Sequence, residues 1–425
     1  MKRAPVLESG GNGKRYRGED DFDEAGGGGG FEEEAEDFML YEAGEGVEYD
    51  EEAAVARWSR GNAENFSDNS QSVCFQWVDI DLTSGEPLAR NPSEGSAFVG
   101  SSEGPVPVIR LYGVTSRGTS VVASVHGFTP YFYASLPASV ELSKGNLASI
   151  RSVLDQRLRD RARGEEKKIS SFVLGVDKEA GKQSLLGYQF GTTRDFIKVY
   201  VAVPSLIPGL KRVIDEGFLV PGLGTLSGQT YESNVPFVLR FMIDNNISGS
   251  DWIEVPARTY SLRASQLHAS RCSIELDVTF NNLRPHPSEG VYSSLAPMRI
   301  LSFDIECQGR KGFFPEAQQD PVIQIANTVS LQGSDVPLFK NVFTLNTCLP
   351  IVGAQVICSA TEEEMLLKWR QFVISVDPDI LTGYNIASFD IPVPILTLLT
   401  NDSNPFPLPS IFLTARKLWR SGPRT

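Results

Sequence analysis

The sequence predicts three parts in chain order: an acidic tail, a β-rich domain and an α/β domain. Three observations support this fold class. Residues 1–70 are rich in glycine and acidic residues, residues 71–297 carry repeated runs of β-branched and aromatic residues, and residues 298–392 mix strand and helix patterns. A chain of 425 residues is long enough for two or three such units, each with its own core.

Residues 1–70 are predicted to be a disordered tail. They hold 19 acidic and 7 basic residues, a run of five glycines and little apolar periodicity, so they have little apolar surface to bury. The short basic clusters that begin at Lys2 and Lys14 fit a nuclear localisation signal and scattered solvated charges equally well. Trp58 either anchors the tail to the folded part or lies in a disordered linker, and the composition favours the linker.

The net charge of −14 lies mostly in this tail, so it does not exclude a nucleic-acid partner. The remaining residues hold 34 acidic and 32 basic side chains, which allows a local basic groove. No run of about 18 apolar residues is present, so no membrane span is expected. Five scattered cysteines without C-x-x-C spacing and three histidines argue against a disulfide framework or a zinc site.

The β-rich domain is expected over residues 71–297. Runs of β-branched and aromatic residues, bounded by Gly, Pro or Ser, predict strands over 72–80, 107–115, 119–128 and 130–137. A helix is predicted over 147–161, where four apolar residues recur at helical spacing. Residues 196–206 predict a strand that leads into a helix ending at Gly217.

The α/β domain is expected over residues 298–392. A helix is predicted over 362–376, because Thr361 begins it with capping-box spacing to a glutamate and six apolar residues form a buried stripe. An Asp-Pro pair ends this helix, and a strand at 380–382 then leads into a turn at Gly383. Three further strands are predicted over 299–306, 321–330 and 340–346.

Two acidic residues, Asp304 and Glu306, end the first strand of this domain, and Asp390 follows 86 positions after Asp304. Residues i and i+2 of a strand point to the same face, so Asp304 and Glu306 make an oxygen-rich pair suited to a hard cation such as Mg²⁺. A carboxylate pair on a strand with a later aspartate is the layout of a two-metal phosphodiesterase site. Taken alone, such a pair is more often a solvated strand end, and Asp390 also fits a helix N-cap.

The segments around these acids, LSFDIECQGRKGFFPE and LTGYNIASFDIP, resemble the first two exonuclease motifs of the family B DNA polymerases. HGFTPYFY (126–133), GLGTLSGQTYESNVPFVLRFMID (222–244) and DWIEVPARTY (251–260) are similar to segments of eukaryotic replicative members of that family. The resemblance covers roughly residues 72–392. It implies an RNase H-like 3′–5′ exonuclease domain that removes misincorporated nucleotides from DNA, preceded by an OB-like β-rich domain.

The resemblance also assigns roles to individual residues, and it implies two divalent cations, Mg²⁺ or Mn²⁺. Asp304 is expected to bridge both metals, Glu306 to bind the first metal and orient the attacking water, and Asp390 to hold the second metal. Asn385 is expected to hydrogen-bond to the primer end, and Phe389 is expected to pack against its sugar or base.

The partners that the resemblance implies are primer-template DNA and single-stranded DNA, in the nucleus and away from membranes. Replication accessory subunits and the sliding clamp are expected to bind mostly through regions that this chain lacks. Any iron–sulfur or zinc module of the family is expected to lie outside the chain as well.

The sequence departs from the family pattern at its C-terminal end. The third exonuclease motif, with another metal-binding aspartate and a water-positioning tyrosine, and the polymerase domain have no counterpart here. Residues 393–425 are expected to be a divergent tail from an alternative exon, a retained intron or a gene-model error, because their prolines forbid a long helix. The expectation is therefore a C-terminally truncated exonuclease domain that lacks polymerase activity and significant exonuclease activity.

Other functions and roles remain open at this point. Residues 72–297 fit a non-catalytic module that binds single-stranded DNA on an OB-like sheet, or a regulatory short product. An unrelated RNase H-like exoribonuclease is disfavoured, because it would not need the segments before the nuclease motifs. Phe389 also fits a core position, and Arg310 and Lys311 fit either phosphate contacts or solvated charges.

Overall fold

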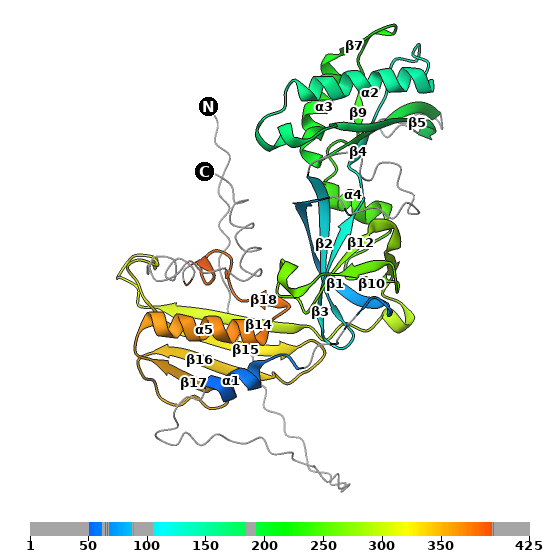
Figure 1. Cartoon of the computed structure of the whole chain (residues 1–425). Coiled ribbons are helices and arrows are strands. Elements are labelled where there is room, and N and C mark those ends of the chain that lie inside the picture. Colours follow the sequence, from blue (N-terminus) through cyan, green and yellow to red (C-terminus); the bar gives the residue numbers. More distant parts are fainter. Residues whose placement is uncertain are drawn as a thin grey trace, which may run out of the picture. The chain divides into compact units, whose positions relative to one another are not determined.

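The computed structural model describes residues 51–61, 64, 66, 68–86, 88, 105–183, 193–392 and 394. These residues form sheets of seven, five and four strands and one two-stranded hairpin (Figure 1). Each of the three larger sheets has an apolar core of its own. Within this part of the chain, no helix combines the length and the apolar character that crossing a membrane requires.

The seven-stranded sheet has the order β11-β12-β3-β2-β1-β10-β13, and its pairs are antiparallel except β12 with β3. Helix α4 (Phe237–Asp244) buries Phe237 and Phe241 in the core of this sheet. The predicted β-rich character is confirmed, and the OB-like form stays a prediction. The strands are β1 (Val73–Gly85), β2 (Val106–Thr115), β3 (Ser120–His126), β10 (Trp252–Val255), β11 (Tyr260–Leu262), β12 (Ile274–Thr279) and β13 (Arg284–His286).

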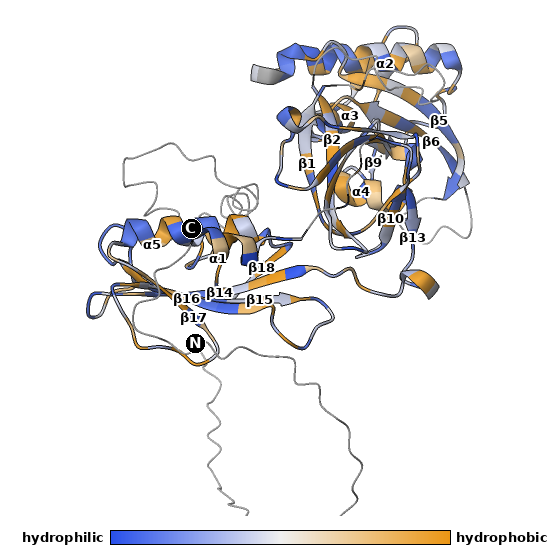
Figure 2. Ribbon diagram, turned by 60° about the horizontal axis from the view of Figure 1, so that its bottom comes forward, coloured by the Kyte–Doolittle hydropathy of each residue, from blue (hydrophilic) through white to orange (hydrophobic). Residues whose placement is uncertain are grey.

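The four-stranded sheet has the order β5-β6-β4-β9, is antiparallel throughout, and carries α2 and α3 on one face. This is the β-α-β-β-α-β arrangement of ferredoxin-like domains, which the sequence patterns did not reveal. Apolar residues of α2 face the sheet while hydrophilic ones face away, as Figure 2 shows. Gly217 ends α3 with a φ of 92°, a left-handed conformation that favours glycine. The elements are β4 (Tyr131–Ala134), α2 (Lys144–Arg159), β5 (Val173–Gln183), β6 (Thr193–Val201), α3 (Ile207–Glu216) and β9 (Thr230–Tyr231), with the hairpin β7 (Phe218–Val220) and β8 (Gly224–Leu226) before β9.

The five-stranded sheet has the order β17-β16-β15-β14-β18. Its first three strands along the chain pair antiparallel, while β18 lies parallel to β14 and β17 lies parallel to β16. This mixed order fits the expected RNase H-like fold, and α5 packs on one face of the sheet. The elements are β14 (Arg299–Cys307), β15 (Val322–Leu331), β16 (Phe339–Leu345), β17 (Gln355–Ser359), α5 (Glu362–Val376) and β18 (Ile380–Thr382). Short 3-10 helices also occur, namely η1 (Gly164–Lys168), η2 (Pro204–Leu206), η3 (Ser265–Leu267), η4 (Phe280–Asn282) and η5 (Gly290–Tyr292).

Helix α5 begins and ends as the sequence predicts. Thr361 accepts a hydrogen bond from the Glu364 amide, which satisfies one of the free amides of the first turn. The Glu364 carboxylate in turn accepts a hydrogen bond from the amide of Ala360, just before the cap. All six predicted apolar residues of the stripe are buried, so the boundaries 362–376 and the buried face are confirmed.

The predicted disorder is wrong for the last part of the tail, because α1 (Glu51–Trp58) is a helix. Its Ala54 and Trp58, one turn apart, are buried in the core of the five-stranded sheet. The Trp58 ring is 1% exposed and meets Phe372 edge-on at 4.9 Å and Phe343 at 6.3 Å. Composition favoured a linker here, but two apolar residues spaced four apart are enough to anchor the helix.

Replacing Trp58 with Ala is expected to lower the free energy of unfolding by about 3–5 kcal/mol, because it empties a closed apolar site. Urea denaturation followed by circular dichroism measures the change. Glu52→Ala, on the exposed side of the same helix, is the matched control and is expected to stay within about 0.5 kcal/mol of the unsubstituted chain. Equal stability of the two variants would show that α1 is not part of this core.

Candidate active site

The two acids of β14 lie on the face of the five-stranded sheet that α5 does not cover. Leu301, Phe303 and Ile305 are buried in the core, whereas Asp304 and Glu306 alternate with them and are exposed. The period of two along a strand places both carboxylates on the same side. The structure therefore agrees with the expected orientation of this pair.

The segment after β18 crosses the end of β14 close to Asp304. The parallel pairing of the two strands stops at Ser302 and Thr382. Gly383 then passes so near to β14 that an added Cβ would lie 2.4 Å from the carbonyl oxygen of Phe303. A side chain at this position is sterically excluded without backbone movement, so the approach requires glycine. The turn continues through Asn385, whose φ of 55° is a left-handed value that asparagine tolerates well.

Asp390 is held against β14 by a backbone hydrogen bond. Its Oδ1 accepts the amide of Ile305 at 3.0 Å, and its side chain is 1% exposed. Burial raises the pKa of Asp390, the Ile305 amide works against that rise, and the charge of Asp304 adds to it. Oδ2 of Asp390 is also buried, and it has no hydrogen-bond partner in the described structure. Two carboxylates thus lie close together, and one of them has an unsatisfied buried oxygen.

One feature of this arrangement, the buried oxygen of Asp390, suits a divalent cation. A buried carboxylate oxygen without a hydrogen-bond donor is costly, and a cation satisfies it. Asp304 and Asp390 are the acids that the structure brings together, while Glu306 lies two residues farther along the same face. Among the described residues, no group of three or more His, Cys, Asp or Glu side chains is arranged to hold a metal ion. The three-acid metal site therefore stays a prediction.

The two residues expected at the primer end lie on the same turn. Asn385 is exposed, and its carbonyl accepts the amides of Ser388 and Phe389. Phe389 is half-buried against the core, and its ring lies 5.0 Å from that of Phe314 at an angle of 64°. Phe314 and its neighbour Phe313 are 69% and 67% exposed. Sequence reasoning did not single out Phe314, although two adjacent aromatic residues in a polar loop were a visible signal.

The loop between β14 and β15 is fixed by Asp320. Its carboxylate accepts hydrogen bonds from the amides of Arg310 and Glu316 and from the Arg310 guanidinium. The guanidinium also lies 5.2 Å from the centre of the Phe313 ring. Arg310 is therefore not simply a solvated charge, and a phosphate contact by this residue stays a prediction. Lys311 is exposed.

The sequence is similar to known proteins over most of its length. Residues 228–401 match the profile of "DNA polymerase family B, exonuclease domain". Three curated relatives, each named DNA polymerase delta catalytic subunit, come from Arabidopsis thaliana, Drosophila melanogaster and Mesocricetus auratus. Their identities to the chain are 43% over 358 residues, 40% over 390 residues and 37% over 353 residues.

These matches cover 84%, 90% and 83% of the chain, but 31%, 35% and 31% of the relatives. The chain therefore spans about a third of the length of the curated relatives that it matches. One solved structure, the family B DNA polymerase from the hyperthermophilic archaeon Pyrobaculum calidifontis, overlaps with 77% of the chain and 33% of its own at 22% identity. The TM-score of 0.49 is too low to establish a shared fold.

The variant Asp390→Asn is expected to be more stable than the unsubstituted chain at pH 7 when divalent cations are absent. The amide is neutral, and its oxygen still accepts the Ile305 amide. Because the pKa of Asp390 is raised by folding, the unsubstituted chain gains stability as the pH falls and Asp390 takes up a proton. The advantage of the variant is therefore expected to shrink as the pH approaches the usual carboxyl value of about 4.

Urea denaturation at a series of pH values measures this difference. The control is Asp335→Asn, which changes an exposed carboxylate between β15 and β16 of the same five-stranded sheet. A stability difference for Asp390→Asn that does not vary with pH, or the same trend in the control, would contradict the assigned environment.

Proposed function

The chain belongs to DNA polymerase family B, and from this membership we propose that residues 298–392 form a 3′–5′ exonuclease site that acts on DNA with divalent cations. One observation carries the proposal: Asp390 is buried beside Asp304 with one carboxylate oxygen unsatisfied. Such an oxygen is satisfied either by a cation or by a proton shared with Asp304, and the family membership favours the cation.

The proposed roles follow from where the side chains lie. Asp304 and Asp390 would hold the cations, the latter with an oxygen that has no hydrogen-bond donor, and Glu306 would orient the attacking water from the same face of β14 as Asp304. When bound, the cations supply an activated water and stabilise the charge on the phosphate and on the leaving 3′ oxygen. Asn385 hydrogen-bonds to the 3′ terminus, and Phe389 packs against its sugar or base.

The proposed substrate is the 3′ end of a primer strand, presented as single-stranded DNA, in the nucleus. The curated relatives are DNA polymerase delta catalytic subunits about three times as long as this chain. Polymerase activity, accessory subunits and the sliding clamp are proposed to belong to regions of such longer proteins that this chain does not match. Residues 298–392 of this chain are proposed to contribute the proofreading activity.

The alternative, a non-catalytic module that binds single strands, needs exposed aromatic rings on a sheet. The four-stranded sheet carries Tyr131 and Tyr133, but both are buried. Lysine side chains already occupy their faces, with Lys198 at 3.8 Å from the Tyr131 ring and Lys182 at 4.2 Å from the Tyr133 ring. These contacts leave little ring surface for bases, so the nuclease proposal is preferred.

Two linked measurements test the proposal. Mn²⁺ at a hundredfold excess over its dissociation constant is expected to raise the free energy of unfolding by about 2.7 kcal/mol, and this gain is lost in Asp304→Ala. Mg²⁺-dependent shortening of a 5′-labelled single strand from its 3′ end is expected to be weak, in line with the expectation from the sequence, and to disappear in the same variant. Asp335→Ala, which removes an exposed carboxylate, is the control for both.

The outcomes separate the two functions. Loss of Mn²⁺ stabilisation in Asp304→Ala supports the cation site, and 3′ shortening that disappears with it supports catalysis. Single-strand binding that is independent of metal, with neither Mn²⁺ stabilisation nor shortening, supports the non-catalytic module and contradicts the exonuclease.

A further inference from the structure

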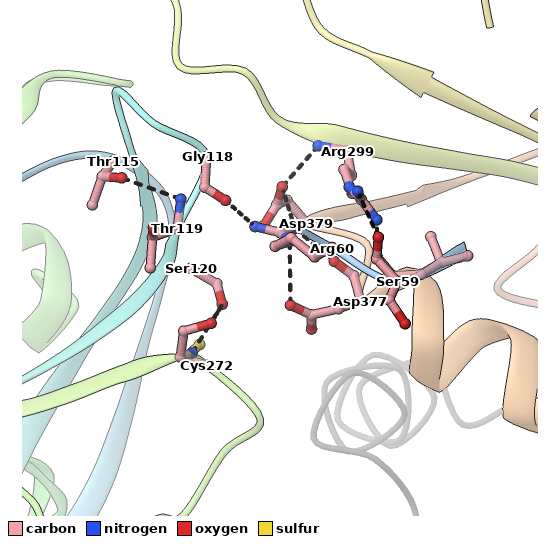
Figure 3. Close-up of polar contacts among 12 residues, drawn as sticks. Ser59, Arg60, Thr115, Gly118, Thr119, Ser120, Cys272, Arg299, Asp377 and Asp379 are labelled. Carbon is pink, nitrogen blue, oxygen red and sulfur yellow. Dashed lines mark hydrogen bonds and ion pairs between the residues drawn. The ribbon is translucent and has the colours of Figure 1, made fainter. Parts of the chain in front are cut away.

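A charged cluster lies where β14 and β18 begin, at the end of both strands away from the acids (Figure 3). Its centre is Arg60, which follows α1 and has a side chain only 11% exposed. We propose that Arg60 is a positioning residue for the exonuclease site: it fixes the start of β18 against β14 and thereby places Asp390 beside Asp304. This inference rests on the proposed function.

The guanidinium of Arg60 contacts three separate parts of the chain. It donates to the backbone oxygens of Gly118 at 2.7 Å and Asp377 at 2.6 Å, and it pairs with the carboxylates of Asp377 at 3.4 Å and Asp379 at 2.8 Å. Figure 3 shows Arg60 between Gly118 and the two aspartates. A planar fork with five donors can make such a set of bonds at once, and a lysine cannot.

The residues that Arg60 holds are the ones that set the course of β18. Asp377 ends α5 in a left-handed conformation with φ 48° and ψ 60°, which few residues besides glycine, asparagine and aspartate adopt. Two residues later, Asp379 exchanges hydrogen bonds with Arg299: its amide donates to the Arg299 carbonyl at 2.9 Å, and its carboxylate accepts the Arg299 amide at 2.7 Å. The pairing of β14 with β18 starts at the next residues, Ile300 and Ile380.

Arg299 belongs to the same cluster and connects it to the C-terminal ends of α1 and α5. Its guanidinium donates to the carbonyls of Trp58 at 3.1 Å and Ser59 at 3.3 Å, just after α1, and to the carbonyl of Val376 at 3.0 Å, at the end of α5. A cation is favourable at the C-terminal end of a helix, where free carbonyls gather. The two arginines therefore fix the ends of α1 and α5 and the starts of β14 and β18 together.

The two aspartates depend on this positive charge. Asp377 and Asp379 lie in a buried environment that raises the pKa of each, while Arg60 opposes the rise in both. Arg299 and Arg271 also act on Asp377, and Ser120 donates a hydrogen bond to it. Removing Arg60 leaves two carboxylates in a poorly solvated site with weaker compensation, so the turn at Asp377 is expected to rearrange.

A rearrangement of the turn at Asp377 would be transmitted to Asp304 and Asp390 through β14 and β18. Asp304 is five residues after Arg299, about 17 Å along a strand that rises about 3.3 Å per residue. The segment to Asp390 starts from β18, and the close approach at Gly383 allows little lateral freedom. A shift of β18 relative to β14 therefore moves Asp390 away from the Ile305 amide and from Asp304, and an ångström matters in such a site.

The test compares Arg60→Ala and Arg60→Lys in the full 425-residue chain. The control is Arg117→Ala, which removes a nearby arginine whose side chain is 79% exposed and paired with Glu64 at 3.5 Å. The first readout is hydrogen–deuterium exchange of the segments 299–306 and 380–391 relative to the segments 339–345 and 355–359 of the same sheet. The second readout is the affinity for Mn²⁺.

Arg60→Ala is expected to speed exchange at least tenfold in 299–306 and 380–391, with much smaller changes in 339–345 and 355–359. Its Mn²⁺ affinity is expected to fall at least threefold, with partial rescue in Arg60→Lys and no change in Arg117→Ala. Should Arg60→Ala fail to fold, Arg60→Lys against the unsubstituted chain decides through the same two readouts.

Unchanged exchange in 299–306 and 380–391, or equal acceleration in all four segments, would overturn the positioning role. A failure of the proposed exonuclease function would give a different experimental result. If the unsubstituted chain binds no Mn²⁺, the cation site is wrong, and the comparison of exchange between segments still decides whether Arg60 holds β18 in place.

Discussion

The candidate site depends on one requirement, which is that the open backbone edge of β14 beyond Ser302 must find hydrogen-bond partners. Strand β18 covers this edge only as far as Thr382. Buried amides are rarely left unpaired, and Asp390 supplies the acceptor for Ile305 at 3.0 Å. The same bond buries a carboxylate beside Asp304 and leaves its second oxygen without a donor. The Ile305 amide thereby holds Asp390 beside Asp304, while burial raises the pKa of the Asp390 carboxyl.

Sequence patterns predicted the parts of this arrangement that local chemistry controls. The strand ending in Asp304 and Glu306, the boundaries of α5 and its buried stripe follow from periodicity and capping, and all of them are observed. That Glu306 joins Asp304 and Asp390 in one metal site stays a prediction. A ligand set depends on side-chain positions at sub-ångström accuracy, and neither spacing nor family resemblance supplies that.

Long-range contacts are what the sequence could not reveal. Trp58 follows a short Ala- and Val-containing segment in an acidic tail, and nothing in that segment indicates Phe343 and Phe372 as its partners. The ferredoxin-like unit was hidden for a similar reason. Its strands β4 and β9 are short, and the order β5-β6-β4-β9 joins segments far apart in the chain. Residues distant in sequence decide both features, and propensity carries no information about which of them will meet.

The position of α1 has a consequence for how the chain is made. Trp58 leaves the ribosome more than 300 residues before Phe372, one of the rings that it packs against. At the usual 5–20 residues per second this interval lasts roughly 15–60 s. The two β-rich units are complete well before then, whereas the nuclease sheet cannot close its core until its first and last helices are both available. Vectorial synthesis thus lets this α/β domain mature only after the two β-rich units.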